Sequence, residues 1–213
     1  TETITFFTRV PLSKFFLSGT WNPTGSSPEF GIWALIIGTL KITVIATIVA
    51  VPIGLGAAIY LNEYASDRSR RIIKPILEIL AGIPTIVFGF FALTFVTPIL
   101  RNLIPNLGEF NSISPGIVVG IMIVPMITSM SEDAMSSVPD KIREGAFGLG
   151  ATKFEVATKV VLPAATSGVV ASIVLGISRA IGETMIVSLA AGSSPTSSLS
   201  LTSSIQTMTG YIV

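Results

Sequence analysis

The sequence predicts an all-α membrane protein in which transmembrane helices pack as a bundle. Half of the 213 residues are hydrophobic and only 12% are charged, and the mean hydropathy is +0.78. A water-soluble domain of this length rarely carries so few charges on its surface. Apolar stretches of about 20 residues, the length that crosses a bilayer core of about 30 Å as a helix, also recur along the chain.

The apolar stretches lie at about residues 30–61, 72–100, 115–130 and 164–191. We expect each of the four to cross the membrane once. The first is longer than the hydrocarbon core, and Pro52 and Gly54 allow it to bend. The second is interrupted at residues 82–84, Gly-Ile-Pro, where a proline disrupts helical hydrogen bonding. The fourth contains two charged residues, Arg179 and Glu183.

The charges of the connecting segments predict how the helices are oriented. Residues 63–74 and 140–159 each contain four Lys or Arg residues, whereas residues 102–114 and 192–210 contain none. Because basic residues accumulate in cytoplasmic loops, the first two segments are expected to be cytoplasmic. Residues 1–29 are then extracytoplasmic, and their Gly, Pro and Ser residues predict an exposed loop before the first helix.

Several classes of function have little support in the composition. The chain has no Cys and no His, which excludes disulfides, thiolate or imidazole catalysis and most zinc sites. The net charge of +1 comes without a basic run, so nucleic-acid binding is not expected. An intramembrane enzyme could use Glu183 and Ser178, but no base or metal cluster accompanies them. A further alternative is a non-transporting scaffold subunit in a membrane complex, which would have no need of Arg179.

A charged segment, residues 139–165, separates the third and fourth apolar stretches. Pro139 followed by Asp140 predicts the start of one short helix. Thr152 with Glu155 three residues later is a capping-box pattern, which predicts a second helix that Pro163 ends or redirects. The apolar face expected on this pair consists of Phe147, Leu149, Phe154, Ala157 and Val161. Such a face fits a groove on a partner protein or, equally from periodicity alone, the membrane surface.

The same segment resembles the EAA loop by which permeases of ABC importers bind their ATPase subunits. The residues that match at the usual spacing are Glu144, Ala146, Gly150, Leu162 and Pro163, whereas Gly145 and Val160 stand where Ala and Ile are usual. The resemblance implies a MetI-like helical bundle with a cytoplasmic coupling helix. It also implies that this loop, including Gly145, enters a cleft of the ATPase subunit and moves when ATP binding closes that subunit.

Three longer strings resemble the permeases of the phosphate ABC importer, and the PstC-like subunit more than the PstA-like one. They are GTLKITVIATIVAVPIGLGAAIYLNEYAS, PILEILAGIPTIVFGFFAL and SRAIGETMIVSLAAG. The resemblance implies a single permease domain over residues 1–213, without the family's first and last helices, in the plasma membrane of a bacterium or archaeon. A permease for sulfate or molybdate remains the alternative.

The implied partners are a second, PstA-like permease subunit, two copies of an ATPase subunit and an extracytoplasmic phosphate-binding protein. No GxxxxGK[ST] string occurs, so ATP and Mg would bind the ATPase and no cofactor is expected in this chain. Besides these proteins, membrane lipids are the expected surroundings.

Arg179 is the strongest candidate for the transport path. It lies about fifteen residues into the fourth stretch, and Glu183 is expected one turn further on the same face. An Arg inside the membrane costs about 2.5 kcal/mol or more, so it should face a polar cavity or a partner. Its planar fork of donors suits a tetrahedral oxyanion. We hypothesise that Arg179 attracts phosphate while Glu183 weakens the attraction so that the anion can leave. The alternative is a structural ion pair.

Two further residues are weaker candidates for the path. Glu78 lies two turns into the second stretch and either lines the path or pairs with Lys74 at the interface. Thr85 follows the break at residues 82–84, where free backbone groups could bind an anion, although a proline in a membrane helix is often only a kink. Because Pro163 leads directly into the fourth stretch, movement of the loop could reach Arg179.

Overall fold

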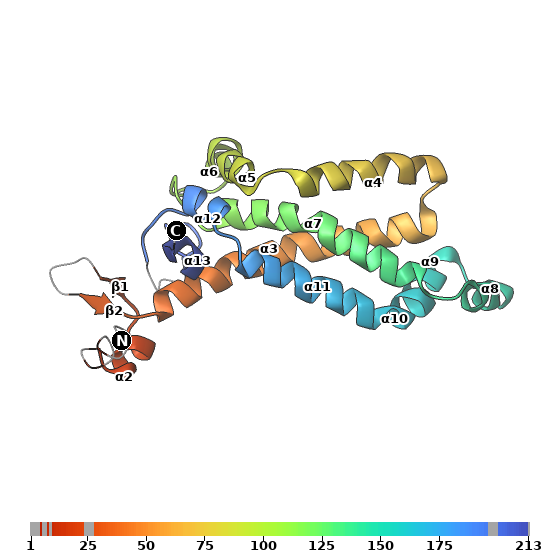
Figure 1. The fold of residues 1–213 in the computed structure, drawn as a ribbon. Coiled ribbons are helices and arrows are strands. Elements are labelled where there is room, and N and C mark those ends of the chain that lie inside the picture. The colour runs from red at the N-terminus through yellow and green to blue at the C-terminus, as the bar shows by residue number, and fades with distance from the viewer. Residues whose placement is uncertain (1–4, 6–7, 9, 24–27, 196–199, 213) are drawn as a thin grey trace. The chain divides into compact units, whose positions relative to one another are not determined.

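The computed structural model describes residues 5, 8, 10–23, 28–195 and 200–212, and helices form most of this part of the chain (Figure 1). The long helices are α3 (Trp33–Ile59), α4 (Asp67–Gly82), α7 (Ile113–Ser136) and α11 (Thr166–Ile181). The shorter ones are α2 (Leu12–Leu17), α5 (Thr85–Phe91), α6 (Thr97–Leu103), α8 (Asp140–Gly148), α9 (Lys153–Glu155), α10 (Leu162–Ala164), α12 (Met185–Ala190) and α13 (Met208–Ile212). Three π-helical segments, η1 (Tyr60–Tyr64), η2 (Ala92–Val96) and η3 (Val156–Val161), continue neighbouring helices.

The chain forms two compact units. Unit 1 contains residues 1–45, 84–119 and 181–213, and unit 2 contains residues 46–83 and 120–180. Helices α3 and α7 supply residues to both units. That residues 1–213 form a single permease domain stays a prediction.

Within the described part of the chain, three helical segments are long and apolar enough to cross a membrane: Trp33–Tyr64, Thr85–Leu103 and Ile113–Ser136. A fourth candidate is a pair, Lys153–Ala164 and Thr166–Ile181, bent by 76°. The predictions for the first and third apolar stretches are therefore confirmed.

The second apolar stretch is not one helix. Helix α4 ends at Gly82, and Ile83 and Pro84 are extended, with ψ angles of 130° and 138°. The residue before a proline is sterically disfavoured in the helical region, which favours a break here. The predicted break is thus confirmed, but a continuous span over residues 72–100 is wrong, because the apolar helix of spanning length begins at Thr85.

The fourth stretch also contains a break that the sequence analysis missed. Helix α11 ends at Ile181, and α12 starts at Met185. The Glu183 carboxylate accepts hydrogen bonds from the backbone N–H groups of Met185 and Ile186, at 3.1 and 3.3 Å. A carboxylate at this position satisfies donors that the first helical turn leaves free. The prediction that Glu183 follows Arg179 on the same helix face is therefore wrong.

Unit 1 is organised by the close crossing of α5 and α12. A Cβ atom on Gly89 would lie 2.8 Å from Leu189 Cδ1 and 3.2 Å from Ile186 Cα. Only glycine lets the two helices approach so closely. The C-terminal segment is tied to the same unit, since Lys41 Nζ donates a 2.9 Å hydrogen bond to the carbonyl of Ser200.

The N-terminal part of unit 1 contains more structure than the expected loop. Strands β1 (Trp21–Asn22) and β2 (Glu29–Phe30) pair antiparallel, and the Trp21 ring meets that of Tyr211 edge-on at 5.0 Å. Residues 1–4, 6–7, 9 and 24–27 of the predicted 1–29 loop, and residues 196–199 of the predicted 192–210 loop, lie outside the described residues.

Unit 2 packs around Ile127 of α7. A Cβ atom would lie 2.9 Å from the Ile127 side chain both on Gly54 of α3 and on Gly176 of α11. One turn along, the hydroxyls of Ser131 and Ser172 are 2.7 Å apart and fully buried. Small residues at such crossings give membrane helices their tight van der Waals contact.

The segment 139–165 belongs to unit 2 and folds as two short helical pieces, as predicted. Helix α8 follows Pro139, and α9, η3 and α10 form the second piece. The capping box is present: Glu155 N donates to Thr152 Oγ1, and Thr152 N donates to the Glu155 carboxylate at 3.1 Å. Ala157 and Val161, which were expected on the exposed apolar face, are instead buried in the core of unit 2.

Enlarging Gly176 is expected to destabilise unit 2. Gly176→Val would place methyl groups against Ile127, and overpacking of this kind costs about 1–3 kcal/mol. The melting temperature of the detergent-solubilised protein should fall, and Ile127→Ala should restore part of the loss. Gly56→Val is the matched control, because a Cβ atom on Gly56 meets nothing within 4 Å. An equal fall in both valine variants would contradict the packing role.

The capping box should be visible in the titration of Glu155. The backbone N–H of Thr152, the Lys159 ammonium and the Thr152 hydroxyl lower the pKa of this carboxyl from 4.5 to about 2. Its contribution to stability is thus fully present above pH 4.5 and is lost as the pH falls towards 2. Thr152→Val removes the hydroxyl, so the pKa of Glu155 should rise while staying below 4.5. Carboxyl NMR of the protein in detergent measures the shift, and an unchanged midpoint would argue against the box.

Candidate functional site

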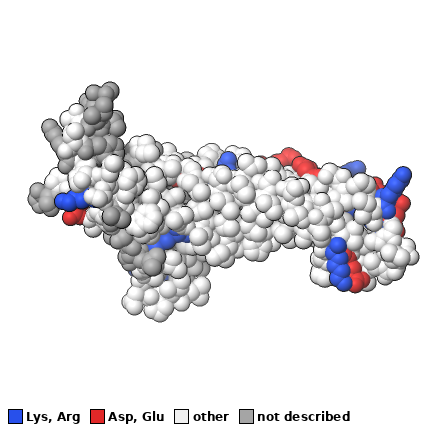
Figure 2. Space-filling model, turned by 90° about the horizontal axis from the view of Figure 1, so that it is seen from below, with Lys and Arg blue, Asp and Glu red and all other residues white. Residues whose placement is uncertain are grey.

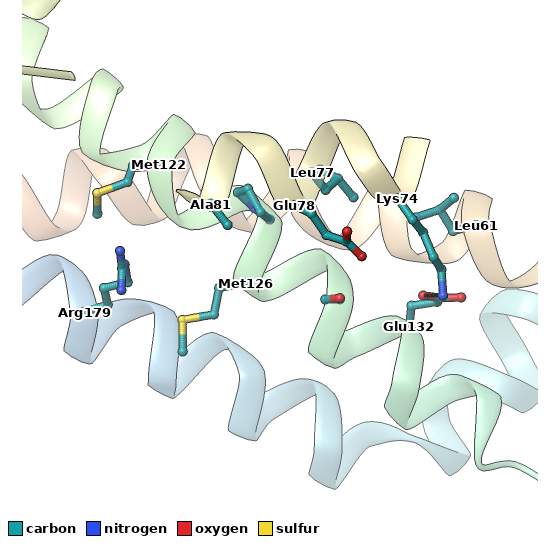
Figure 3. A pocket seen from close by; sticks show the side chains of 11 residues that line it. Leu61, Lys74, Leu77, Glu78, Ala81, Met122, Met126, Glu132 and Arg179 are labelled. Atoms are coloured by element: carbon teal, nitrogen blue, oxygen red, sulfur yellow. Dashed lines mark ion pairs between the residues drawn. The ribbon is translucent and has the colours of Figure 1, made fainter. Parts of the chain in front are cut away.

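A pocket of about 260 Å³ lies within unit 2, between α4, α7 and α11 (Figure 3). Its apolar lining comes from two methionines of α7 and from aliphatic residues of η1 and α4. Its charged lining consists of Lys74, Glu78, Glu132 and Arg179. The pocket therefore combines two cations and two acids with an otherwise largely apolar lining.

Two of these charges neutralise each other. Lys74 Nζ lies 2.8 Å from Glu132 Oε2, and the Glu132 side chain is only 4% exposed. A carboxylate so well buried needs a partner, because removing it from water uncompensated is costly. The alternative in which Lys74 pairs with Glu78 is therefore wrong: Lys74 of α4 pairs with α7 instead.

The other two charges are directed into the pocket. Figure 3 shows the Arg179 side chain rising from α11 towards Met122 of α7, and the Glu78 carboxylate extending from α4. Within its own unit, Arg179 makes no ion pair or side-chain hydrogen bond with a described residue. It is thus the cation in this pocket that is available to an anion.

The structure brings together only part of the predicted path. Arg179 and Glu78 both line the pocket, whereas Thr85, the first residue of α5, and Glu183, which caps α12, belong to unit 1 and are not among its lining residues. Sequence reasoning missed Glu132. Its signal was the first of two adjacent acids, Glu132 and Asp133, at the end of a long uncharged stretch, which is where a partnered membrane carboxylate would be sought.

Residues 139–165 are called the coupling loop after the role that the resemblance implies, and the first half of this loop lies on α8. Glu144 is exposed, and the space around Gly145 is open, with nothing within 4 Å of where a Cβ atom would lie. Ala146 is half-buried and packs against the core of unit 2. The motif therefore presents its acid outwards while its alanine holds the helix to the unit.

Gly150 makes the turn between the two helical pieces. Its φ angle is +84°, a region that side chains with a Cβ atom rarely adopt. Hydrogen bonds from Gly150 N to Phe147 O and from Ala151 N to Ala146 O, at 2.9 and 3.1 Å, close the end of α8. This is the usual way in which a glycine ends a helix.

Leu162 and Pro163 stand where the second helical piece meets α11. Leu162 packs partly against the core, and exposed Pro163 occupies the first turn of α10. The chain bends by 76° after Ala164. The prediction that the helix is redirected at Pro163 is thereby confirmed.

An apolar patch is exposed on the coupling loop. It consists of Ile142, Phe147, Leu149 and Phe154, and Leu149 is 91% exposed. A groove of about 430 Å³ lies beside it, with Glu155 and Lys159 on its rim. Charged side chains of both signs gather at the end of unit 2 that holds α8 and α9 (Figure 2). Such a patch with a charged rim is typical of a protein-binding surface.

Relatives of known name share most of the chain. A permease protein of Bacillus subtilis, described as the probable ABC transporter permease protein YqgH, is 38% identical over 180 residues, covering 84% of this chain and 58% of its own length. The phosphate transport system permease protein PstC of Haemophilus influenzae is 37% identical over 200 residues, with 85% and 63% covered. That of Mesorhizobium japonicum is 34% identical over 218 residues, with 93% and 66% covered. The chain thus spans about three fifths of the length of these relatives.

A solved structure and a family profile both resemble this chain. A chain of the inward-facing MetNI methionine ABC transporter superposes with a TM-score of 0.54 at 21% identity, covering 71% of this chain and 68% of that chain. The likeness confirms the predicted MetI-like helical fold. The sequence profile of the binding-protein-dependent transport system inner membrane components matches residues 50–213. This chain is therefore a multi-pass membrane protein and belongs to that family, the permeases of ABC importers.

Proposed function

We propose that this chain is the membrane-spanning part of an ATP-driven importer that moves inorganic phosphate delivered by an external binding protein. The observation that supports this proposal most is the pocket of unit 2. There, Arg179 has no described partner in its own unit, whereas Lys74 is already paired with Glu132. An arginine fork binds a tetrahedral oxyanion through two parallel hydrogen bonds. The names of the relatives as phosphate permeases support phosphate as the anion.

The arrangement of charge favours passage over tight binding. One guanidinium attracts the anion into the pocket, and the Glu78 carboxylate in the lining of the same pocket opposes the negative charge of that anion. An acid in the same pocket therefore limits the affinity, so that the anion can leave. This role replaces the one first given to Glu183, which caps α12 instead.

The ATP-driven step belongs to separate chains in this proposal. The exposed patch around Leu149 docks into an ATPase subunit that binds ATP and Mg, two copies of which serve this chain and a second, PstA-like permease. The 91% exposure of Leu149 supports this, since water alone penalises such a surface and a groove on a partner would bury it. No cofactor of this chain is proposed.

Arg179→Gln is expected to lower phosphate uptake by about tenfold or more, because a hydrogen bond to a charged group is worth about 1.5–3 kcal/mol. Uptake is measured in liposomes that contain the complete importer, after co-purification has shown that the complex assembles. Arg68→Gln, which removes an exposed arginine of α4, is the control. Phosphate uptake at the parent rate in Arg179→Gln would contradict the proposed role of Arg179. If sulfate alone stimulates ATP hydrolysis, sulfate and not phosphate is the transported anion.

Leu149→Ser should weaken binding of the ATPase by about 1–2 kcal/mol, roughly five- to thirtyfold in dissociation constant. Because Leu149 is 91% exposed, the melting temperature of the permease itself should not change. Titration of the purified permease with its ATPase gives the affinity. Leu12→Ser, at another exposed leucine in α2, serves as the comparison, and equal affinity for both variants would exclude the patch as the docking surface.

A further inference from the structure

Arg143 directly precedes Glu144 on α8 and holds that helix to the end of α7. Its Nη2 donates to the carbonyl of Met135 at 2.7 Å, and its Nη1 donates to the carbonyl of Val138 at 3.1 Å and to Asp140 Oδ1 at 2.8 Å. The side chain is only 15% exposed. The guanidinium thus fixes the start of the coupling helix to the helix before it.

The same guanidinium contacts a second part of unit 2. Arg143 Nε lies 3.3 Å from Glu63 Oε1, and the Glu63 side chain is 8% exposed. The contact is an ion pair without hydrogen-bond alignment. Glu63 belongs to η1, which continues α3, and Asn62 Nδ2 donates to the same carboxylate oxygen at 3.3 Å. A buried carboxylate and a nearly buried guanidinium in contact will move together, because separating them leaves the Glu63 carboxylate without its ion-pair partner.

From η1 the contacts continue to α4. Arg70, in the first turns of α4, donates from Nε to the carbonyl of Leu61 at 2.9 Å and from Nη2 to the carbonyl of Asn62 at 3.0 Å. These bonds fix the turn between η1 and α4. Helix α4 then carries Lys74 and Glu78 into the pocket, where Lys74 is paired with Glu132.

We propose that Arg143 is a positioning residue that transmits movement of the coupling helix, through Glu63 and η1, to α4 and the charged wall of the pocket. This proposal rests on the proposed docking of the loop to an ATPase. The route differs from the one through Pro163, because it reaches the pocket from α4 and not from α11. Every residue in it belongs to unit 2.

The contacts that join α8 to α7 and to Glu63 of η1, here called the link, require an arginine at position 143. Three nitrogens of one planar group face two carbonyls and two carboxylates in different directions. A lysine carries the same charge on a single nitrogen and cannot bridge α7, η1 and α8 at once. Arg143→Lys should therefore keep the charge of the loop and still lose the link.

The test uses the complete importer in liposomes and follows the pocket directly. The chain has no cysteine, so Ala81→Cys places a single thiol on a pocket-lining position. Its rate of reaction with a maleimide is measured with and without ATP and vanadate. In the parent the two rates should differ. In Arg143→Gln and in Glu63→Gln that difference should shrink by roughly two- to thirtyfold, the effect of residues along such a network.

Further variants separate a link from a merely structural contact. The double variant should lose no more than Arg143→Gln alone, because both substitutions interrupt the contact between Arg143 and Glu63, and Arg143→Lys should resemble Arg143→Gln. Arg68→Gln is the matched control and should respond as the parent does. In Glu63→Gln, basal ATP hydrolysis and co-purification of the ATPase should stay at parent levels. If Arg143→Gln fails to assemble, Glu63→Gln carries the test, since Glu63 lies outside the coupling loop.

The proposal would be overturned if assembled Glu63→Gln or Arg143→Gln showed the same difference in maleimide reaction rate, with and without ATP and vanadate, as the parent. It would also be overturned if the losses of the two single variants added up in the double variant, or if the rate in the parent did not depend on ATP. The readout needs no cargo, so it separates this proposal from the phosphate hypothesis. If phosphate fails to stimulate the parent while the thiol still responds to ATP, the cargo assignment fails and the link stands.

Discussion

Ile127 of α7 lies against Gly54 of α3 and Gly176 of α11, and the helical frame of unit 2 depends on this close approach. Inside a bilayer the helices gain nothing from leaving lipid for one another except van der Waals contact and hydrogen bonds, so small residues must let them meet. The approach brings Ser131 and Ser172 within 2.7 Å of each other. Any larger residue at either glycine would separate α7 from a neighbour and alter the wall of the pocket.

Among the charged residues that line the pocket of unit 2, one pair is neutralised and two charges are left open. Glu132 is buried against Lys74. Arg179 and Glu78 face the pocket, and neither takes part in an ion pair with a described residue of unit 2. A paired charge is costly to disturb, whereas a charge in an open pocket can exchange its partners. The pair thus adds rigidity, and in the proposed function the open cation is the group that binds an anion transiently.

The coupling loop is both a surface and a part of the core. Leu149 and Phe154 are exposed, while Ala157 and Val161 of the following turns are buried in unit 2. Arg143 adds polar contacts to α7 and η1. Since a packed core is close to incompressible, a force applied to the exposed patch would be passed on to the helices and not absorbed by the loop.

The sequence by itself determined the features that depend on near neighbours. The break before Pro84, the capping box of Thr152 and the glycine turn at Gly150 are set by backbone sterics and hydrogen bonds within a few residues, and apolar length identified the first and third spans. It also placed Arg179 and Glu78 as pocket candidates. The tertiary structure alone decided that Lys74 pairs with Glu132 and that Glu183 caps α12. Burial and ion pairs depend on contacts between residues far apart in the chain, and a local sequence pattern does not identify which distant side chain will be the partner.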